Sequence, residues 1–121
     1  MPKVLIIEDD PQQLHLYVTA FSHREFVVEE AANGPEGLAK AANEKPDVIL
    51  LDLLLPGMSG FEILERLKAK PETKDIPIVV MSNLTKKDVD QDALNKGAKI
   101  FLSKAEYVPR QIVEKVKEIL T

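Results

Sequence analysis

Four carboxylates follow two apolar runs of this 121-residue chain, and they are the residues best suited to chemistry. Glu8, Asp9 and Asp10 end the first run, and Asp52 ends the second. If the two runs are neighbouring strands of one sheet, these carboxylates meet at one edge. Like charges about 4 Å apart repel by roughly 4 kcal/mol at an effective dielectric near 20, so packing alone rarely retains such a cluster. The pattern indicates a site for a hard cation, and then chemistry on one carboxylate.

The composition indicates one globular domain over residues 1–121, with 45% hydrophobic and 30% charged residues. No apolar run approaches the roughly 18 residues of a membrane span, and no secretory leader is recognisable, so we expect a cytoplasmic protein without membrane contact. The absence of cysteine excludes disulfides, thiolate metal sites and a cysteine nucleophile. The net charge of −4 argues against a nucleic-acid surface.

The elements that must position these carboxylates alternate regularly along the chain. The predicted strands are 3–8, 26–31, 47–52, 76–81 and 99–102. The predicted helices start at Pro11 behind the cap Asp10, at about 35 behind Asn33-Gly34, at Ser59, at Thr85 and at about 109. Ser59 with Glu62, and Thr85 with Asp88, have the spacing of a capping box.

This alternation predicts a doubly wound (βα)₅ α/β fold, with a five-stranded parallel sheet covered by helices on both faces. The continuous run 48–51 is typical of a strand buried on both sides. The more polar run 26–31 is the predicted edge strand. Because the last predicted helix reaches the end of the chain, we expect no output domain after it.

Ligands of open α/β sheets bind at the carboxyl ends of the strands. Besides the carboxylates, the fourth predicted strand ends at Ser82, and the fifth is followed by Lys104. Carboxylates suit Mg²⁺, and an aspartate such as Asp52 can act as a nucleophile toward phosphorus. Ser82 and Lys104 could then bind phosphoryl oxygens by a hydrogen bond and by charge.

The chain resembles the receiver domains of two-component response regulators. The resemblance rests on Glu8-Asp9, on the segment Asp52-Leu-Leu-Leu-Pro-Gly-Met-Ser-Gly60, on Ser82 and on Lys104, and it covers essentially all of the chain. It implies a flavodoxin-like sandwich with the strand order 2-1-3-4-5.

The resemblance also implies a Mg²⁺ site. Asp9 and the acceptor Asp52 would bind the ion directly, and Glu8 would bind it through water. The backbone carbonyl of Leu54 would be a further ligand, and the side chain of Leu54 would border the pocket.

The same resemblance implies that Asp52 is the phosphoacceptor, supplied by a histidine kinase or a histidine phosphotransfer protein. Ser82 would be the switch hydroxyl, Lys104 the phosphate-binding cation and Phe101 the switch aromatic. Output would pass to a protein target through the face of the fourth helix, fifth strand and fifth helix. No enzymatic activity is expected beyond self-catalysed phosphotransfer and slow autodephosphorylation.

Three positions depart from the family pattern. Lys104 is followed by Ala105, where the family usually has a cis proline, and we expect a trans bond because a cis bond without proline costs about 2.5–4 kcal/mol. Leu54 and Leu84 stand two residues after Asp52 and Ser82. Neither can orient an attacking water, which predicts slow loss of the phosphoryl group.

Other interpretations of these residues remain open. Asp10 is predicted only to cap a helix, and His15 and His23 are predicted surface residues. The chain could be a scaffold receiver that binds partners without phosphorylation. It could also be a Mg²⁺-dependent phosphohydrolase, although such enzymes commonly carry a second aspartate where Leu54 stands.

Overall fold

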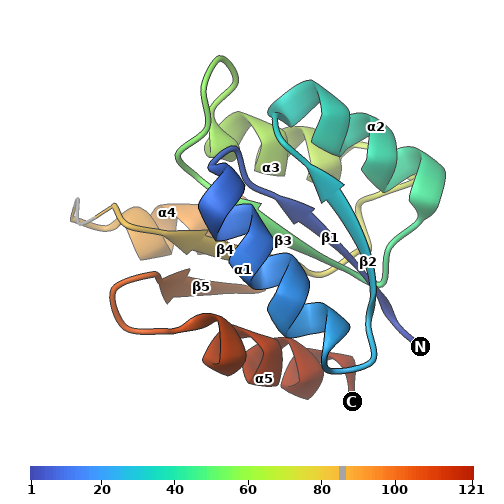
Figure 1. Ribbon diagram of the computed structural model, residues 1–121. Coiled ribbons are helices and arrows are strands. Elements are labelled where there is room, and N and C mark those ends of the chain that lie inside the picture. The colour runs from blue at the N-terminus through green and yellow to red at the C-terminus, as the bar shows by residue number, and fades with distance from the viewer. Residues whose placement is uncertain (85–86) are drawn as a thin grey trace.

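The computed structural model describes residues 1–84 and 87–121, in which strands and helices alternate along the chain (Figure 1). The strands are β1 Lys3–Ile7, β2 Val27–Ala31, β3 Val48–Asp52, β4 Ile78–Ser82 and β5 Ile100–Ser103. The helices are α1 Pro11–Ser22, α2 Gly34–Glu44, α3 Gly60–Ala69, α4 Val89–Asn95 and α5 Pro109–Leu120.

The strands form one parallel sheet in the order β2-β1-β3-β4-β5, which confirms the predicted fold class. β2 lies at an edge, as its polar sequence predicted. β1 and β3 are neighbours, and Ile7 pairs with Leu51 in their register. The residues that follow, Glu8 and Asp52, therefore leave the two strands at the same edge of the sheet.

Helices cover both faces of the sheet, and each face has its own core (Figure 1). Because side chains alternate along a strand, Leu5 and Ile7 pack toward α2, α3 and α4, whereas Val4 and Ile6 pack toward α1 and α5. All four side chains are fully buried. Burial of each such aliphatic side chain stabilises the fold by roughly 1.5–3 kcal/mol. The strand ends are therefore held in place by a well-packed core.

Side chains cap the first three helices where the sequence predicted caps. Asp10 accepts from the backbone N–H of Gln12 at 2.9 Å, and Asn33 caps α2 in the same manner. The Ser59 hydroxyl accepts from the N–H of Glu62 at 3.2 Å and starts α3. These caps fix where each helix begins relative to the strand before it.

Helix α4 begins later than the sequence predicted, at Val89. The predicted cap, Thr85, lies outside the described residues. Lys87 and Asp88 form a turn, and Asp88 has φ +65°, a left-handed conformation that cannot belong to a helical first turn. The prediction that the helix ends before Gly97 is confirmed, since α4 ends at Asn95.

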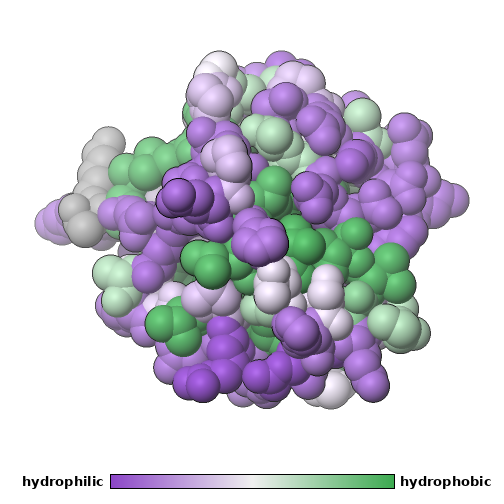
Figure 2. Space-filling model, viewed as in Figure 1, coloured by the Kyte–Doolittle hydropathy of each residue, from purple (hydrophilic) through white to green (hydrophobic). Residues whose placement is uncertain are grey.

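Hydrophilic residues cover most of the face in Figure 2, and apolar residues gather in a band across its middle, over the region of α1 and β2. Leu16 and Val27 are two exposed apolar residues of these elements. None of the described helices has both the length and the apolar character needed to cross a membrane.

Candidate functional site

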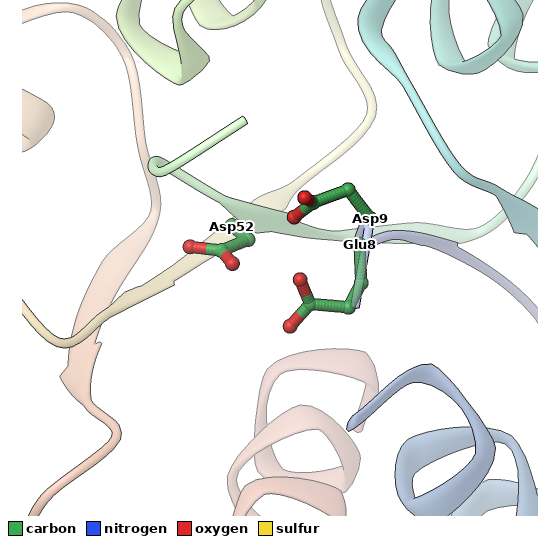
Figure 3. Close-up of side chains that lie close together, drawn as sticks. All are labelled: Glu8, Asp9 and Asp52. Atoms are coloured by element: carbon green, nitrogen blue, oxygen red, sulfur yellow. The ribbon is translucent and has the colours of Figure 1, made fainter. Parts of the chain in front are cut away.

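Three carboxylates converge at the carboxyl edge of the sheet (Figure 3). Glu8 and Asp9 follow β1, and Asp52 is the last residue of β3. One carboxylate oxygen from each lies within 4.8 Å of those of the other two. Glu8 and Asp52 are only 1% and 3% exposed, whereas Asp9 is open to solvent. The cluster is thus a buried pair with one solvent-facing member.

Lys104, directly after β5, places its ammonium between the two buried carboxylates. Its Nζ donates to Glu8 Oε1 at 2.7 Å and to Asp52 Oδ2 at 2.9 Å. The same nitrogen donates to Oε1 of Gln13 in the first turn of α1. No motif of the sequence singles out Gln13. Its place three residues after the cap Asp10, on a helix that starts at this edge, was the available signal.

The electrostatics of the site follow from burial and crowding. Burial, with hydrogen bonding and repulsion from Asp52, raises the pKa of Glu8 from its ordinary 4.5 to about 7, although Lys104 opposes the shift. Burial alone would lower the pKa of Lys104, but its bonds to Glu8 and Asp52 and their charges raise it above its ordinary value. Lys104 therefore remains an ammonium. Its single positive charge only partly balances the negative charges of Glu8 and Asp52.

The three carboxylates suit a Mg²⁺ ion. Octahedral Mg²⁺ with oxygens at 2.0–2.1 Å brings adjacent ligand oxygens about 2.9 Å apart. The carboxylate oxygens of this cluster, within 4.8 Å of one another, could therefore close onto such an ion through small side-chain movements. Since Asp9 faces solvent, such an ion could also keep several of its waters, as Mg²⁺ usually does. The donor set therefore fits the ion that the sequence predicted.

The loop after β3 folds back over the end of that strand. The N–H of Leu54 donates to Asp52 Oδ1 at 3.0 Å, and the Leu54 side chain is 49% exposed at the rim of the site. The N–H of Gly60 donates to Leu53 O at 3.1 Å. A Cβ on Gly60 would lie 2.4 Å from the Cα of Leu53, so only glycine allows α3 to start against this loop.

Ser82 ends β4 at the same edge and is fully buried. Its hydroxyl accepts from the N–H of Leu84 at 3.0 Å, and its carbonyl accepts from the N–H of Lys104 at 2.9 Å. Ser82 is thus tied by its backbone to the residue that carries the ammonium, and by its side chain to the loop before α4.

Phe101 is the second residue of β5, three positions before Lys104, and is partly buried against the core on the α4 side. It lines a groove of about 390 Å³ between α4 and the chain after β5. The other lining residues are Leu84, Val89, Asp90, Ser103, Glu106 and Tyr107. Leu84 therefore connects the groove to the site, because its backbone N–H donates to Ser82 and it also lines the groove.

Three smaller predictions about residues in or near the site are confirmed. The Lys104–Ala105 bond is trans as predicted, since no cis peptide bond occurs in residues 1–84 and 87–121. His15 and His23 are exposed, also as predicted. Asp10 caps α1 through its side chain.

Comparisons with known proteins agree with this architecture. The chain is 34% identical to PilH of Pseudomonas aeruginosa over 107 residues, which are 86% of this chain and 86% of that protein. It is 31% identical to DivK of Brucella anthropi over 121 residues, covering 99% of this chain and 98% of DivK. With PleD of Caulobacter vibrioides it shares 35% identity over 102 residues, 84% of this chain but only 22% of PleD.

Solved structures share the fold over nearly the whole chain. The chemotaxis protein CheY4 of Vibrio cholerae superposes with a TM-score of 0.90 at 28% identity, covering 98% of each chain. A CheX–CheY–BeF₃–Mg²⁺ complex from Borrelia burgdorferi contains a chain with a TM-score of 0.88 at 26% identity, covering 98% of this chain and 89% of that one. The family model of the response regulator receiver domain matches residues 4–117, and this chain therefore belongs to that family.

Proposed function

We propose that residues 1–121 are a single phosphoacceptor receiver domain and that Asp52 is its acceptor. The observation that carries the proposal is the ammonium of Lys104 seated 2.9 Å from Asp52 Oδ2, with the carboxylates of Glu8 and Asp9 alongside. A buried carboxylate with a fixed cation beside it can attack phosphorus and have the incoming negative charge neutralised. Relatives of this family are signalling receivers, which supports a signalling role over an enzymatic one.

Mg²⁺ is the proposed cofactor. Asp9, Asp52 and the backbone carbonyl of Leu54 would hold the ion, with Glu8 reaching it through water. Bound Mg²⁺ would supply positive charge against the carboxylates and the phosphoryl oxygens. The relative solved with BeF₃ and Mg²⁺ supports this choice of ion.

The phosphoryl donor would be the phosphohistidine of a histidine kinase or a phosphotransfer protein. An oxygen of Asp52 forms a bond to phosphorus while the phosphorus–nitrogen bond of the donor breaks, and the donor imidazole keeps the electron pair. Lys104 then transfers its hydrogen bond from the Asp52 carboxylate to a phosphoryl oxygen. The Ser82 hydroxyl, which rests against the N–H of Leu84, turns to donate to another phosphoryl oxygen.

The output surface would be the face of α4, β5 and α5, with Phe101 as the switch aromatic. If the Ser82 hydroxyl turned away from the N–H of Leu84, Leu84 could move and change the shape of the groove that it lines together with Phe101. A downstream protein would bind there, without contact to nucleic acid or membrane, and the expected location is the cytoplasm. The second candidate is a scaffold receiver that uses the same surface without phosphorylation.

Incubation with acetyl phosphate and Mg²⁺, followed by intact-protein mass spectrometry, tests the proposal. We expect a mass increase of one phosphoryl group in the parent and in the control Asp75→Asn, whose carboxylate is exposed. We expect none in Asp52→Asn or with EDTA. A parent that takes up no phosphoryl group favours the scaffold function, and sustained hydrolysis of phosphate esters favours the phosphohydrolase.

A further inference from the structure

The Lys104 ammonium has three N–H donors, and three side-chain acceptors receive them. Glu8 and Asp52 provide carboxylate oxygens, and Gln13 provides an amide oxygen. Because an ammonium can only donate, the amide must present its oxygen to Lys104. The three acceptors come from the ends of β1 and β3 and from α1, so the nitrogen is held from three directions.

We propose that Gln13 is a positioning residue for phosphotransfer, which holds the Lys104 ammonium in the direction of the acceptor carboxylate. The inference rests on the proposed function of Asp52. Gln13 itself would touch neither the metal nor the phosphoryl group. Its role would be carried entirely through the third hydrogen bond of Lys104.

The start of α1 fixes Gln13 in place. Asp10 caps the helix and accepts from the backbone N–H groups of Gln12 and Gln13. One turn further on, the buried ring of Tyr17 has its centroid 6.0 Å from the Lys104 nitrogen. Two side chains of one helical face, at positions i and i+4, therefore border the ammonium.

A cavity adjoins the ammonium on the side of Gln13. Gln13, Tyr17 and Lys104 line a cavity of about 230 Å³ on the α1 side of the site. Without the amide oxygen, the third N–H would have no side-chain acceptor and would face this cavity. With a phosphoryl group on Asp52, the ammonium must change one partner, and the bonds to Glu8 and Gln13 are those that can remain unchanged.

The variant Gln13→Met tests the contact because methionine has a similar length, favours helices and lacks the amide acceptor. The matched control is Gln12→Met, on an exposed neighbour in the same turn. In ¹⁵N-resolved NMR of the unphosphorylated protein, we expect slow exchange of the Lys104 ammonium protons with water in the parent and in Gln12→Met. We expect fast exchange in Gln13→Met and protection in Gln13→Glu, which keeps an acceptor. Equal protection in Gln13→Met and the parent overturns the contact, as does loss of protection in Gln13→Glu.

Phosphorylation kinetics test the role in transfer. We expect the maximal rate with acetyl phosphate to fall about fivefold in Gln13→Met and to stay unchanged in Gln12→Met, with the same half-saturating Mg²⁺ concentration throughout. An unchanged rate, or a shift in half-saturating Mg²⁺ alone, overturns the positioning role. A parent that accepts no phosphoryl group refutes the proposed function instead, and the NMR comparison still decides whether Gln13 holds Lys104.

Discussion

The ammonium nitrogen of Lys104 lies 2.9 Å from Oδ2 of Asp52, and both side chains are more than nine-tenths buried. Glu8, on the other side of the same nitrogen at 2.7 Å, is buried as well. A buried charge whose partner is removed is costly, because neither water nor another ion replaces the lost interaction. Removal of this one cation should therefore lower the stability of the domain.

Lys104→Met should destabilise the metal-free protein by about 3–5 kcal/mol at pH 8, since two buried carboxylates are left facing each other. Urea unfolding measures the loss, with Lys99→Met, on an exposed lysine, as the control. The loss should shrink at pH 5.5, because protonation of Glu8 removes one of the two charges. An equal loss at both pH values would contradict this electrostatic explanation.

The pKa of Glu8 predicts how stability varies with pH. Its value of about 7 in the folded protein, against 4.5 ordinarily, means that the folded state binds this proton more tightly than the unfolded chain. The contribution of Glu8 to the free energy of unfolding is therefore largest below about pH 4.5 and is lost as the pH rises through 7. In EDTA, we expect a loss of about 1–3 kcal/mol from this group between pH 5 and 8.

Glu8→Gln isolates this contribution because the amide does not titrate. The difference in unfolding free energy between parent and Glu8→Gln should change with pH in EDTA and change much less in saturating Mg²⁺, which would favour the charged form of Glu8. Parallel pH profiles of the two proteins in EDTA would show that Glu8 is not the titrating group.

Leu54 and Leu84 predict a long-lived phosphoryl group. Leu54→Asn and Leu84→Glu should each speed loss of the phosphoryl group by about tenfold or more, since each adds a polar group that can orient water. The decay of the phosphorylated protein by mass spectrometry measures the half-life. Leu54 is the cleaner position, because its side chain is half exposed and outside the core. If neither variant decays faster than the parent, the explanation is wrong.

Glu25 connects α1 to β2 with φ +66°, a conformation that disfavours residues with a Cβ. Glu25→Gly should raise the free energy of unfolding by about 0.5–1 kcal/mol, because the relief of strain exceeds the added freedom of the unfolded chain. The control Glu72→Gly, in a turn with ordinary φ, should lower stability instead. Thermal or urea unfolding of both variants makes the comparison. Equal effects of the two substitutions would exclude relief of strain at Glu25.

The fold and the carboxylate cluster were predictable because they depend on short-range patterns. Apolar runs of strand length, with caps such as Asp10 and Ser59 between them, define the alternation of strands and helices. Once parallel strands are inferred, the residues at their ends must share an edge. That rule brings Glu8, Asp9 and Asp52 together, and helix capping accounts separately for Asp10.

Gln13 and the start of α4 were not predictable in the same way. Gln13 is an ordinary helix residue by type, and its contact with Lys104 depends on how α1 crosses the sheet. The capping pattern of Thr85 and Asp88 suggested an earlier helix start, but Asp88 adopts a left-handed conformation and α4 begins at Val89. The start of α4 therefore depends on the backbone conformation at Asp88, which the capping pattern does not reveal.

The exposure of Asp9 bears on how fast a metal ion could exchange at the cluster. Two of the three carboxylates are buried, but the third faces solvent, so an ion could arrive and leave along that side without any opening of the domain. The rate of ion exchange would then be limited by the rate at which the ion loses its bound waters. Such a domain would carry no permanent metal, and its readiness for phosphotransfer would follow the free Mg²⁺ concentration around it from moment to moment.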